Sequence, residues 1–141
     1  MTPDDSLIRW IKRCEGFSTR LYKDTDGKLT IGWGRNLQDR GISVDEAGFM
    51  FTNDLARTIS ELEPFSWFNT QPDNVKNALI NMNFNLGITR LLEFDKMIAA
   101  LENNNYSLAA REALNSEWAA EVGLRAKDIA LMMREGRIHE I

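Results

Sequence analysis

The dipeptide Asp26-Gly27 restricts the fold of this 141-residue chain more than any other feature. It stands between Leu21-Tyr22-Lys23 and Leu29-Thr30-Ile31, and this arrangement is a strong signal for a β-hairpin. Before and after this stretch the apolar residues recur at helical spacing. We therefore expect an α+β fold that is mostly α, with one small hairpin inserted among helices.

Helix signals flank the hairpin on both sides. Thr2 as N-cap and Pro3 in the first turn predict a helix that ends at Gly16, with an apolar face of Leu7, Ile8, Ile11 and Cys14. After a polar loop over 35–42, the capping box Ser43–Glu46 opens a helix that Pro64 stops. Further helical patterns cover 75–86, 91–101, 107–114 and 124–135, and Ser107 is a candidate N-cap.

This order of elements predicts one domain with two lobes. The hairpin lobe covers about 15–42, and the helical lobe covers about 64–141 together with the first helix. The helix that begins at Ser43 joins them. A substrate would lie in the cleft between two such lobes.

The totals argue against several classes of protein. With 17 basic and 21 acidic residues, the net charge of −4 does not provide the broad basic surface that binds nucleic acid. One cysteine, Cys14, forms no intrachain disulfide, and one histidine, His139, leaves too few ligands for the usual zinc hydrolase site. We therefore expect no metal.

Neither a targeting segment nor a membrane span is expected. The N-terminal residues MTPDDSLIRW lack the basic region and the apolar core of a signal peptide. No apolar run reaches the length that crosses a bilayer. The sequence thus predicts synthesis in the cytoplasm and no stable insertion into a membrane.

Two carboxylates and a hydroxyl lie around the hairpin at fixed spacing. Eight residues separate Glu15 from Asp24, and five separate Asp24 from Thr30. A two-residue loop would turn Asp24 and Thr30 to opposite faces, whereas a three-residue loop, Thr25-Asp26-Gly27, pairs Tyr22 with Thr30 and puts both on one face. We expect the three-residue loop, with Gly27 in the left-handed conformation.

These groups can perform glycosidic bond cleavage. Glu15 lies in the last turn of its helix, where the dipole, and burial if it occurs, favour the protonated carboxyl that a general acid needs. An ionised Asp24 beside Thr30 could position water or stabilise positive charge. Spacing alone leaves a plain alternative, in which Glu15 is an acidic helix end and Asp24 a solvated turn residue.

The stretch YKDTDGKLTIGWG, with Glu15, Asp24 and Thr30 at these spacings, resembles the bacteriophage-type lysozyme family, the phage endolysins of glycoside hydrolase family 24. The resemblance continues through Ser43-Val-Asp-Glu-Ala, 80–87, and Ser116-Glu-Trp118. It implies a lysozyme-like muramidase without cofactor. By this resemblance Glu15 is the acid, Asp24 and Thr30 act on water or charge, and Arg125 pairs with Glu15 and orients it.

The resemblance also supplies expectations for residues around the reaction centre. Tyr22, Gly34, Asn81 and Phe84 match positions near the cleft of the family. Where many members have a histidine, this chain has Arg35, and we expect it to pair with Asp54. Trp10 and Trp118 are expected in the core, as is Cys14, while His139 is expected in a frayed tail and Trp33 could be core or stack on a sugar.

The partner implied by the resemblance is peptidoglycan, cleaved between N-acetylmuramic acid and N-acetylglucosamine by a monomer. The enzyme would reach the wall through a separate membrane pore or on lysis. Two alternatives stay open. One is a lytic transglycosylase, which needs no positioned water, and the other is an inactive glycan-binding module. Inversion or retention also stays open.

Overall fold

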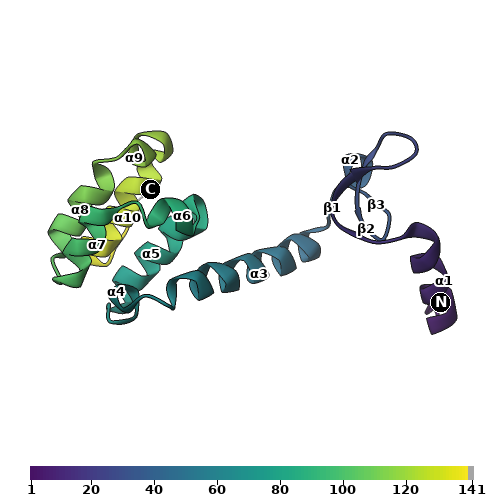
Figure 1. The fold of residues 1–141 in the computed structure, drawn as a ribbon, viewed down its shortest axis with the longest axis horizontal. Coiled ribbons are helices and arrows are strands. Elements are labelled where there is room, and N and C mark those ends of the chain that lie inside the picture. The colour runs from purple at the N-terminus through teal and green to yellow at the C-terminus, as the bar shows by residue number, and fades with distance from the viewer. Residues whose placement is uncertain (140–141) are drawn as a thin grey trace. The chain divides into compact units, whose positions relative to one another are not determined.

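The computed structural model describes residues 1–139 and divides into two compact units, Met1–Phe49 and Met50–Ile141. Figure 1 shows the elements along the chain. The smaller unit contains two helices, a sheet and the start of a long third helix, whereas the larger unit is helical. The α+β, mostly α architecture expected from the sequence is confirmed.

Helix α1 (Asp5–Glu15) begins later than expected. Its N-cap is Asp4, whose Oδ1 accepts a hydrogen bond from the amide of Leu7 at 2.8 Å, and not Thr2. The aspartate carboxylate bonds to a free amide of the first turn, as an N-cap does. The helix ends as expected, since Gly16 has φ of +71° and donates from its amide to the carbonyl of Lys12.

A three-stranded antiparallel sheet follows, in the order β1 (Ser18–Lys23), β2 (Leu29–Gly32), β3 (Arg35–Asn36). Tyr22 pairs with Thr30, and the amide of Asp24 donates to the carbonyl of Lys28 at 2.9 Å. These pairings confirm the three-residue loop. Gly27 has φ of +77°, in the left-handed region that this loop requires.

The segment after the hairpin is not the polar loop that the sequence predicted. It contains β3 and the short helix α2 (Leu37–Arg40). Asn36 explains both, because its backbone pairs with Thr30 while its side-chain Oδ1 accepts from the amide of Asp39 at 3.1 Å. One residue therefore ends the sheet and caps the helix.

Helix α3 (Val44–Leu62) starts at the expected capping box. The amide of Ser43 donates to Glu46 Oε1 at 2.9 Å, and the amide of Glu46 donates to Ser43 Oγ at 3.1 Å. The helix ends two residues before Pro64, as the sequence predicted. It spans the boundary between the two units.

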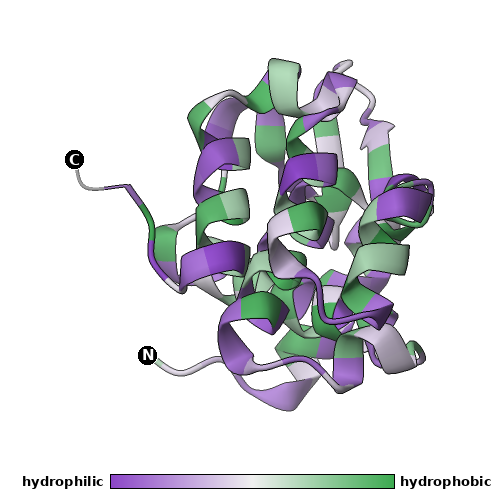
Figure 2. Cartoon of the chain, turned by 90° about the vertical axis from the view of Figure 1, so that its left-hand side faces the viewer, coloured by the Kyte–Doolittle hydropathy of each residue, from purple (hydrophilic) through white to green (hydrophobic). Residues whose placement is uncertain are grey.

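The larger unit holds the hydrophobic core. Its helices are α4 (Ser66–Asn69), α5 (Asp73–Leu86), α6 (Ile88–Leu91), α7 (Asp95–Glu102), α8 (Tyr106–Leu114), α9 (Glu117–Val122) and α10 (Leu124–Glu135). Helix α10 packs against α5 and α8, and α7 packs against α8. Figure 2 shows hydrophobic and hydrophilic residues alternating along these helices, and the hydrophobic ones supply the core.

Several details of this unit differ from the sequence prediction. Helices α4 and α6 were not expected, and the pattern over 91–101 corresponds to α7, which begins only at Asp95. The N-cap of α8 is Asn105, whose Oδ1 accepts from the amide of Leu108 at 3.2 Å, and not Ser107. Helix α9 was not anticipated, although Ser116 caps it in the ordinary way. Trp118 in α9 is buried as expected, and its Nε1 donates to Asn85 Oδ1 at 2.8 Å.

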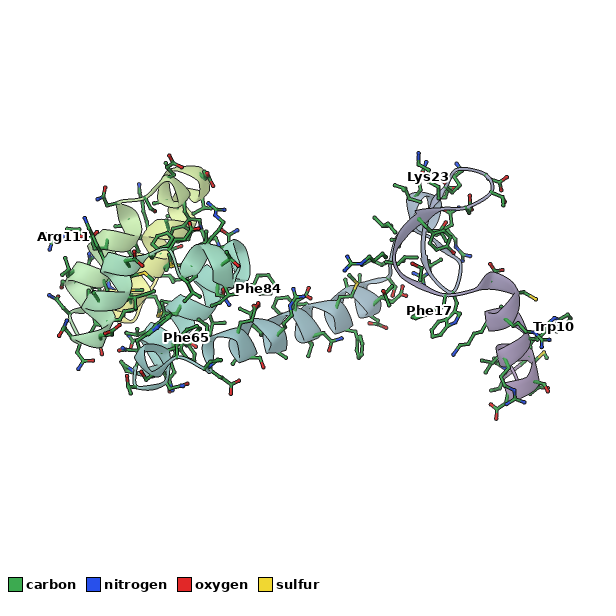
Figure 3. The ribbon with its side chains drawn as sticks, in the orientation of Figure 1. Trp10, Phe17, Lys23, Phe65, Phe84 and Arg111 are labelled. Atoms are coloured by element: carbon green, nitrogen blue, oxygen red, sulfur yellow. The ribbon has the colours of Figure 1, made fainter. Side chains whose placement is uncertain are left out.

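The expectation for His139 is wrong, and those for Cys14 and Trp10 are not met within the smaller unit. No residue of α1 is buried, so Cys14 is exposed and Trp10, which projects from α1 in Figure 3, is 61% exposed. Their apolar stripe is therefore not part of a core within the smaller unit. His139 is not frayed, because its amide and its Nδ1 both contact Asp128 Oδ1, at 2.8 and 2.7 Å. In residues 1–139, no helix combines the length and apolar character needed to cross a membrane.

Candidate active site

Glu15 is the last residue of α1, and its carboxyl lies against the turn between β2 and β3. A Cβ added to Gly34 would meet Glu15 Oε2 at 2.5 Å. Gly34 also has φ of +78°, a conformation that residues with a side chain rarely adopt. The glycine thus leaves room for the glutamate and forms the turn that receives it.

Asp24 is held by backbone amides of the hairpin loop. Its Oδ1 accepts from Asp26 and from Lys28, both at 2.9 Å. Neither bond uses Oδ2, and the side chain is half-buried. This is the Asx turn typical of an aspartate before a tight loop, and it fixes the orientation of the carboxylate.

Thr30 is brought close to Asp24 by the register of the hairpin. Its hydroxyl donates to the carbonyl of Lys28 at 2.9 Å, and the residue is 2% exposed. Because Asp24 accepts from the amide of the same Lys28, both side chains bond to one residue. The hydroxyl keeps its lone pairs as acceptors. Tyr22 lies directly opposite Thr30 on β1.

Arg35 forms an ion pair, but its partner is Glu46. Nη1 donates to Oε1 at 2.9 Å and Nη2 to Oε2 at 2.6 Å, and Nη1 also donates to the carbonyl of Gly41 at 3.1 Å. The Arg35 hydrogen bonds, aided by the amide of Ser43, lower the pKa of Glu46 to about 2. The expected partner, Asp54, lies in the larger unit, so an Arg35–Asp54 contact stays a prediction.

The remaining expected residues lie in the larger unit. Arg125 on α10 contacts Asn81 on α5, where Nε donates to Oδ1 at 3.0 Å and Nη2 to the backbone carbonyl at 3.4 Å. Phe84, also on α5, is 38% exposed and contacts Phe51 with ring centroids 5.7 Å apart. Glu15 belongs to the other unit, so its pairing with Arg125 stays a prediction.

Beside Glu15 lies an aromatic cluster that the sequence did not reveal. The rings of Phe17 and Trp33 stack with centroids 4.5 Å apart, and Lys12 Nζ lies 4.0 Å from the centroid of Trp33. Trp33, between Gly32 and Gly34, could be singled out from the sequence, but no local pattern indicated that Lys12 and Phe17 would contact it. Among residues 1–139, no three His, Cys, Asp or Glu side chains gather closely enough to hold a metal ion.

Comparison with known proteins agrees with these motifs. Residues 12–135 match the family model described as Phage lysozyme. Two similar proteins are Probable T4-type lysozyme 2 and Probable T4-type lysozyme 1 of Dictyostelium discoideum. The first is 26% identical, covering 96% of this chain and 97% of that protein, and the second is 24% identical, covering 95% and 96%.

A third relative is much longer. The Pre-baseplate central spike protein Gp5 of Enterobacteria phage T4 is 22% identical over a stretch that covers 96% of this chain but 29% of that protein. The family match and both lysozyme relatives extend over most of the present chain. The chain therefore belongs to the phage lysozyme family and is a glycoside hydrolase of the lysozyme type, directed at the cell wall.

Proposed function

We propose that this enzyme is a muramidase that hydrolyses the β-1,4 bond between N-acetylmuramic acid and N-acetylglucosamine in peptidoglycan, with Glu15 as the general acid. The observation that carries this proposal is the position of the Glu15 carboxyl over Gly34, at the end of α1. It is joined by Asp24 and Thr30, which bond to the same residue of the adjoining hairpin.

The proposed reaction adds one water across the broken bond, with its hydroxyl going to the anomeric carbon and a proton to the leaving oxygen. Glu15 gives its proton to the glycosidic oxygen as the bond to the anomeric carbon breaks. A water molecule, held by Asp24 and by the lone pairs of the Thr30 hydroxyl, adds to that carbon and passes a proton to the Asp24 carboxylate, which releases it to solvent. Glu15 takes up a proton from solvent before the next turnover. Asp24 also stabilises the positive charge that develops on the sugar ring.

Residues from both units would contact the glycan. In this proposal Tyr22 and Gly34 lie beside the reacting sugar, and Asn81 and Phe84 contact the chain of sugars from α5. Arg125 would orient Glu15, and its present hydrogen bonds to Asn81 show that its guanidinium is already fixed on one side. The enzyme would act as a monomer, without a cofactor, after release to the wall.

The test is mass spectrometry of the fragments released from purified peptidoglycan. The wild type should release reducing-end fragments that carry one added water, and Glu15→Gln should release none above background. Glu102→Gln is the matched control, since Glu102 is also an exposed glutamate at the last position of a helix, α7. This control should retain wild-type activity.

The other outcomes identify the alternatives. Fragments lighter by one water would mean a lytic transglycosylase, and the role proposed for Asp24 would be wrong. Binding to peptidoglycan without release of fragments, from a wild type whose circular dichroism shows a folded protein, would mean a glycan-binding module. Full activity of Glu15→Gln would remove Glu15 from the reaction.

A further inference from the structure

Lys12 and Glu15 occupy positions on α1 from which their side chains can pair. They are three residues apart, so their side chains emerge as neighbours on the helix surface, where a lysine and a glutamate attract each other. An ammonium beside a carboxyl favours the ionised form of the carboxyl. A general acid needs the protonated form, so this pair would oppose the role proposed for Glu15.

In the structure, the Lys12 ammonium contacts Trp33 and forms no ion pair with Glu15. Its Nζ lies 4.0 Å from the centroid of the Trp33 ring, in the geometry of a cation–π contact. Among the ion pairs of residues 1–139, none includes Glu15. The glutamate carboxyl instead lies against Gly34, the residue after Trp33. Lys12 and Glu15 therefore both contact the β2–β3 turn, but on adjacent residues of it.

A second aromatic residue fixes the tryptophan. Phe17 stacks on Trp33 with an interplanar angle of 29° and centroids 4.5 Å apart. Phe17 follows Gly16, the C-cap of α1, so the ring of Trp33 contacts residues on both sides of Glu15 in the sequence. This arrangement ties the end of α1 to the turn and sets where the ammonium can rest.

Other charged side chains belong to the same elements, but they are placed differently. Arg13 is two residues before Glu15 and so points away from it on the helix. Lys28 contacts Asp39 at 3.4 Å, and Arg35 binds Glu46, so both cations have carboxylate partners. Lys23 is exposed on β1, and Asp24 Oδ1 accepts from two backbone amides of the hairpin loop. Arg125, in the larger unit, is the cation that the family resemblance predicts to pair with Glu15.

We propose that Trp33 is a positioning residue that holds the ammonium of Lys12 and so prevents it from pairing with Glu15. This inference rests on the proposed function, in which Glu15 donates a proton. It predicts that the ring matters for the pH range of activity. Without the ring, Lys12 is free to pair with Glu15, the ionised carboxyl is favoured, and the acid loses its proton at lower pH.

The experiment compares pH profiles of kcat and kcat/KM at low ionic strength for the wild type and four variants. In Trp33→Leu the alkaline limb of both profiles should move to lower pH by about 0.2–0.4 pH unit. This is the pKa shift equivalent to the interaction energy of an exposed lysine–glutamate pair on a helix. Added salt should reduce this shift, because it screens the pair. The double variant Trp33→Leu/Lys12→Met should regain the wild-type limb.

Two single variants complete the set. Lys12→Met should keep the wild-type limb, because it removes the cation that Trp33 holds. Trp33→Phe should also keep it, since phenylalanine retains an aromatic face. If circular dichroism shows that Trp33→Leu is unfolded, Trp33→Met replaces it, as methionine is apolar and extended but has no π face.

Three results would overturn the proposal. One is an unmoved alkaline limb in folded Trp33→Leu, and another is a double variant whose limb stays with that of Trp33→Leu. The third is a raised KM at every pH without a shift of the limb, which would mean that Trp33 contacts the glycan. Each of these needs an active wild type, so they are distinct from failure of the proposed function, in which the wild type releases no fragments.

Discussion

Two separate features of Gly34 favour glycine, its backbone conformation and the space that its missing side chain leaves. Its φ of +78° disfavours any residue with a Cβ, and its missing side chain leaves the space where Glu15 Oε2 lies. Gly32, two residues earlier, shares only the first feature. It has φ of +69°, and a Cβ added there would meet nothing within 4 Å. The two glycines thus form a matched pair.

We expect Gly34→Ala and Gly32→Ala to lose similar stability, about 1–2 kcal/mol, because both force alanine into the left-handed region. Gly34→Ala should lose activity in addition, since its methyl group displaces the Glu15 carboxyl. Urea denaturation measures the first quantity and kcat on peptidoglycan the second. Equal kcat for the two variants would show that Glu15 need not lie over Gly34.

The residues of the site were predictable from sequence to different degrees. The local positions of Glu15, Asp24 and Thr30 follow from the helix end and the loop length, whereas their candidate roles came from the family resemblance, because spacing alone left a plain alternative. Arg35–Glu46 and Lys12–Trp33 were not foreseen, because each joins side chains of two elements whose packing no local pattern reports. The resemblance indicated Asp54 as the ion-pair partner of Arg35. The structure shows Glu46 in that role, because the capping box with Ser43 holds the Glu46 carboxylate within reach of Arg35 on β3.

At the scale of elements, the start of α3 is fixed by one carboxylate. Glu46 accepts from the Ser43 amide and from both Nη atoms of Arg35, so it joins β3 to the first turn of the helix. Its pKa falls from the ordinary 4.5 to about 2. A carboxyl whose pKa is lowered by folding stabilises the folded state at any pH above its ordinary pKa. This contribution is lost as the pH falls from about 4.5 to about 2.

Glu46→Gln should therefore lower Tm at neutral pH and flatten the decline of Tm between pH 4.5 and 2. The measurement is a series of thermal unfolding curves across that range. Asp54→Asn is the matched control, because Asp54 lies on the same helix and was the partner expected from the sequence. If Asp54→Asn flattened the decline instead, the ion pair of Arg35 would involve Asp54.

A buried amide connects three helices of the larger unit. Gln71, 5% exposed, follows α4, and its Nε2 donates to the carbonyls of Trp67 and Leu101 at 2.8 and 3.0 Å. Its Oε1 accepts from the hydroxyl of Tyr106, at the start of α8, at 2.8 Å. The side chain thus links α4, α7 and α8.

Gln71→Leu should destabilise the protein by about 1–3 kcal/mol, because it removes three hydrogen bonds at a buried position. Tyr106→Phe removes one of them and should cost about 1 kcal/mol. Denaturant midpoints of both variants test this order. A Gln71→Leu variant as stable as the wild type would mean that packing by leucine offsets the lost bonds.

The missed elements are those with weak local signals. Helix α3 was predictable because its capping box, apolar periodicity and proline stop agree, and α5 and α10 were predictable because apolar periodicity extends over more than ten residues in each. β3, α2, α4, α6 and α9 have between two and six residues, too few for periodicity to identify. β3 is defined by pairing with β2, which is a tertiary contact and not a property of its own two residues.

At the scale of the whole molecule, buried side chains are unevenly divided. Within residues 1–139, the buried apolar side chains lie between Leu62 and Met133, all in the larger unit, and the buried residue of the smaller unit is Thr30. The smaller unit is instead organised by hydrogen bonds of its hairpin, the cluster around Trp33 and the Arg35–Glu46 pair. Such segments open locally at lower free energy than a packed core.

Hydrogen exchange on the intact chain should show this difference. Amides of α5, α8 and α10 should be protected close to the global free energy of unfolding, and amides of β1 and β2 should exchange sooner. Exchange followed by mass spectrometry of peptides resolves the two groups. Equal protection in both would show that the smaller unit unfolds only together with the larger one.

The exposed thiol of Cys14 has a practical consequence. Cys14 is the single cysteine of the chain, its side chain is exposed, and it immediately precedes Glu15. A fluorophore or spin label that reacts with thiols would therefore attach at one native position beside the proposed acid, with no engineered cysteine. On Glu15→Gln, such a reporter would give a signal for glycan occupancy that does not depend on turnover.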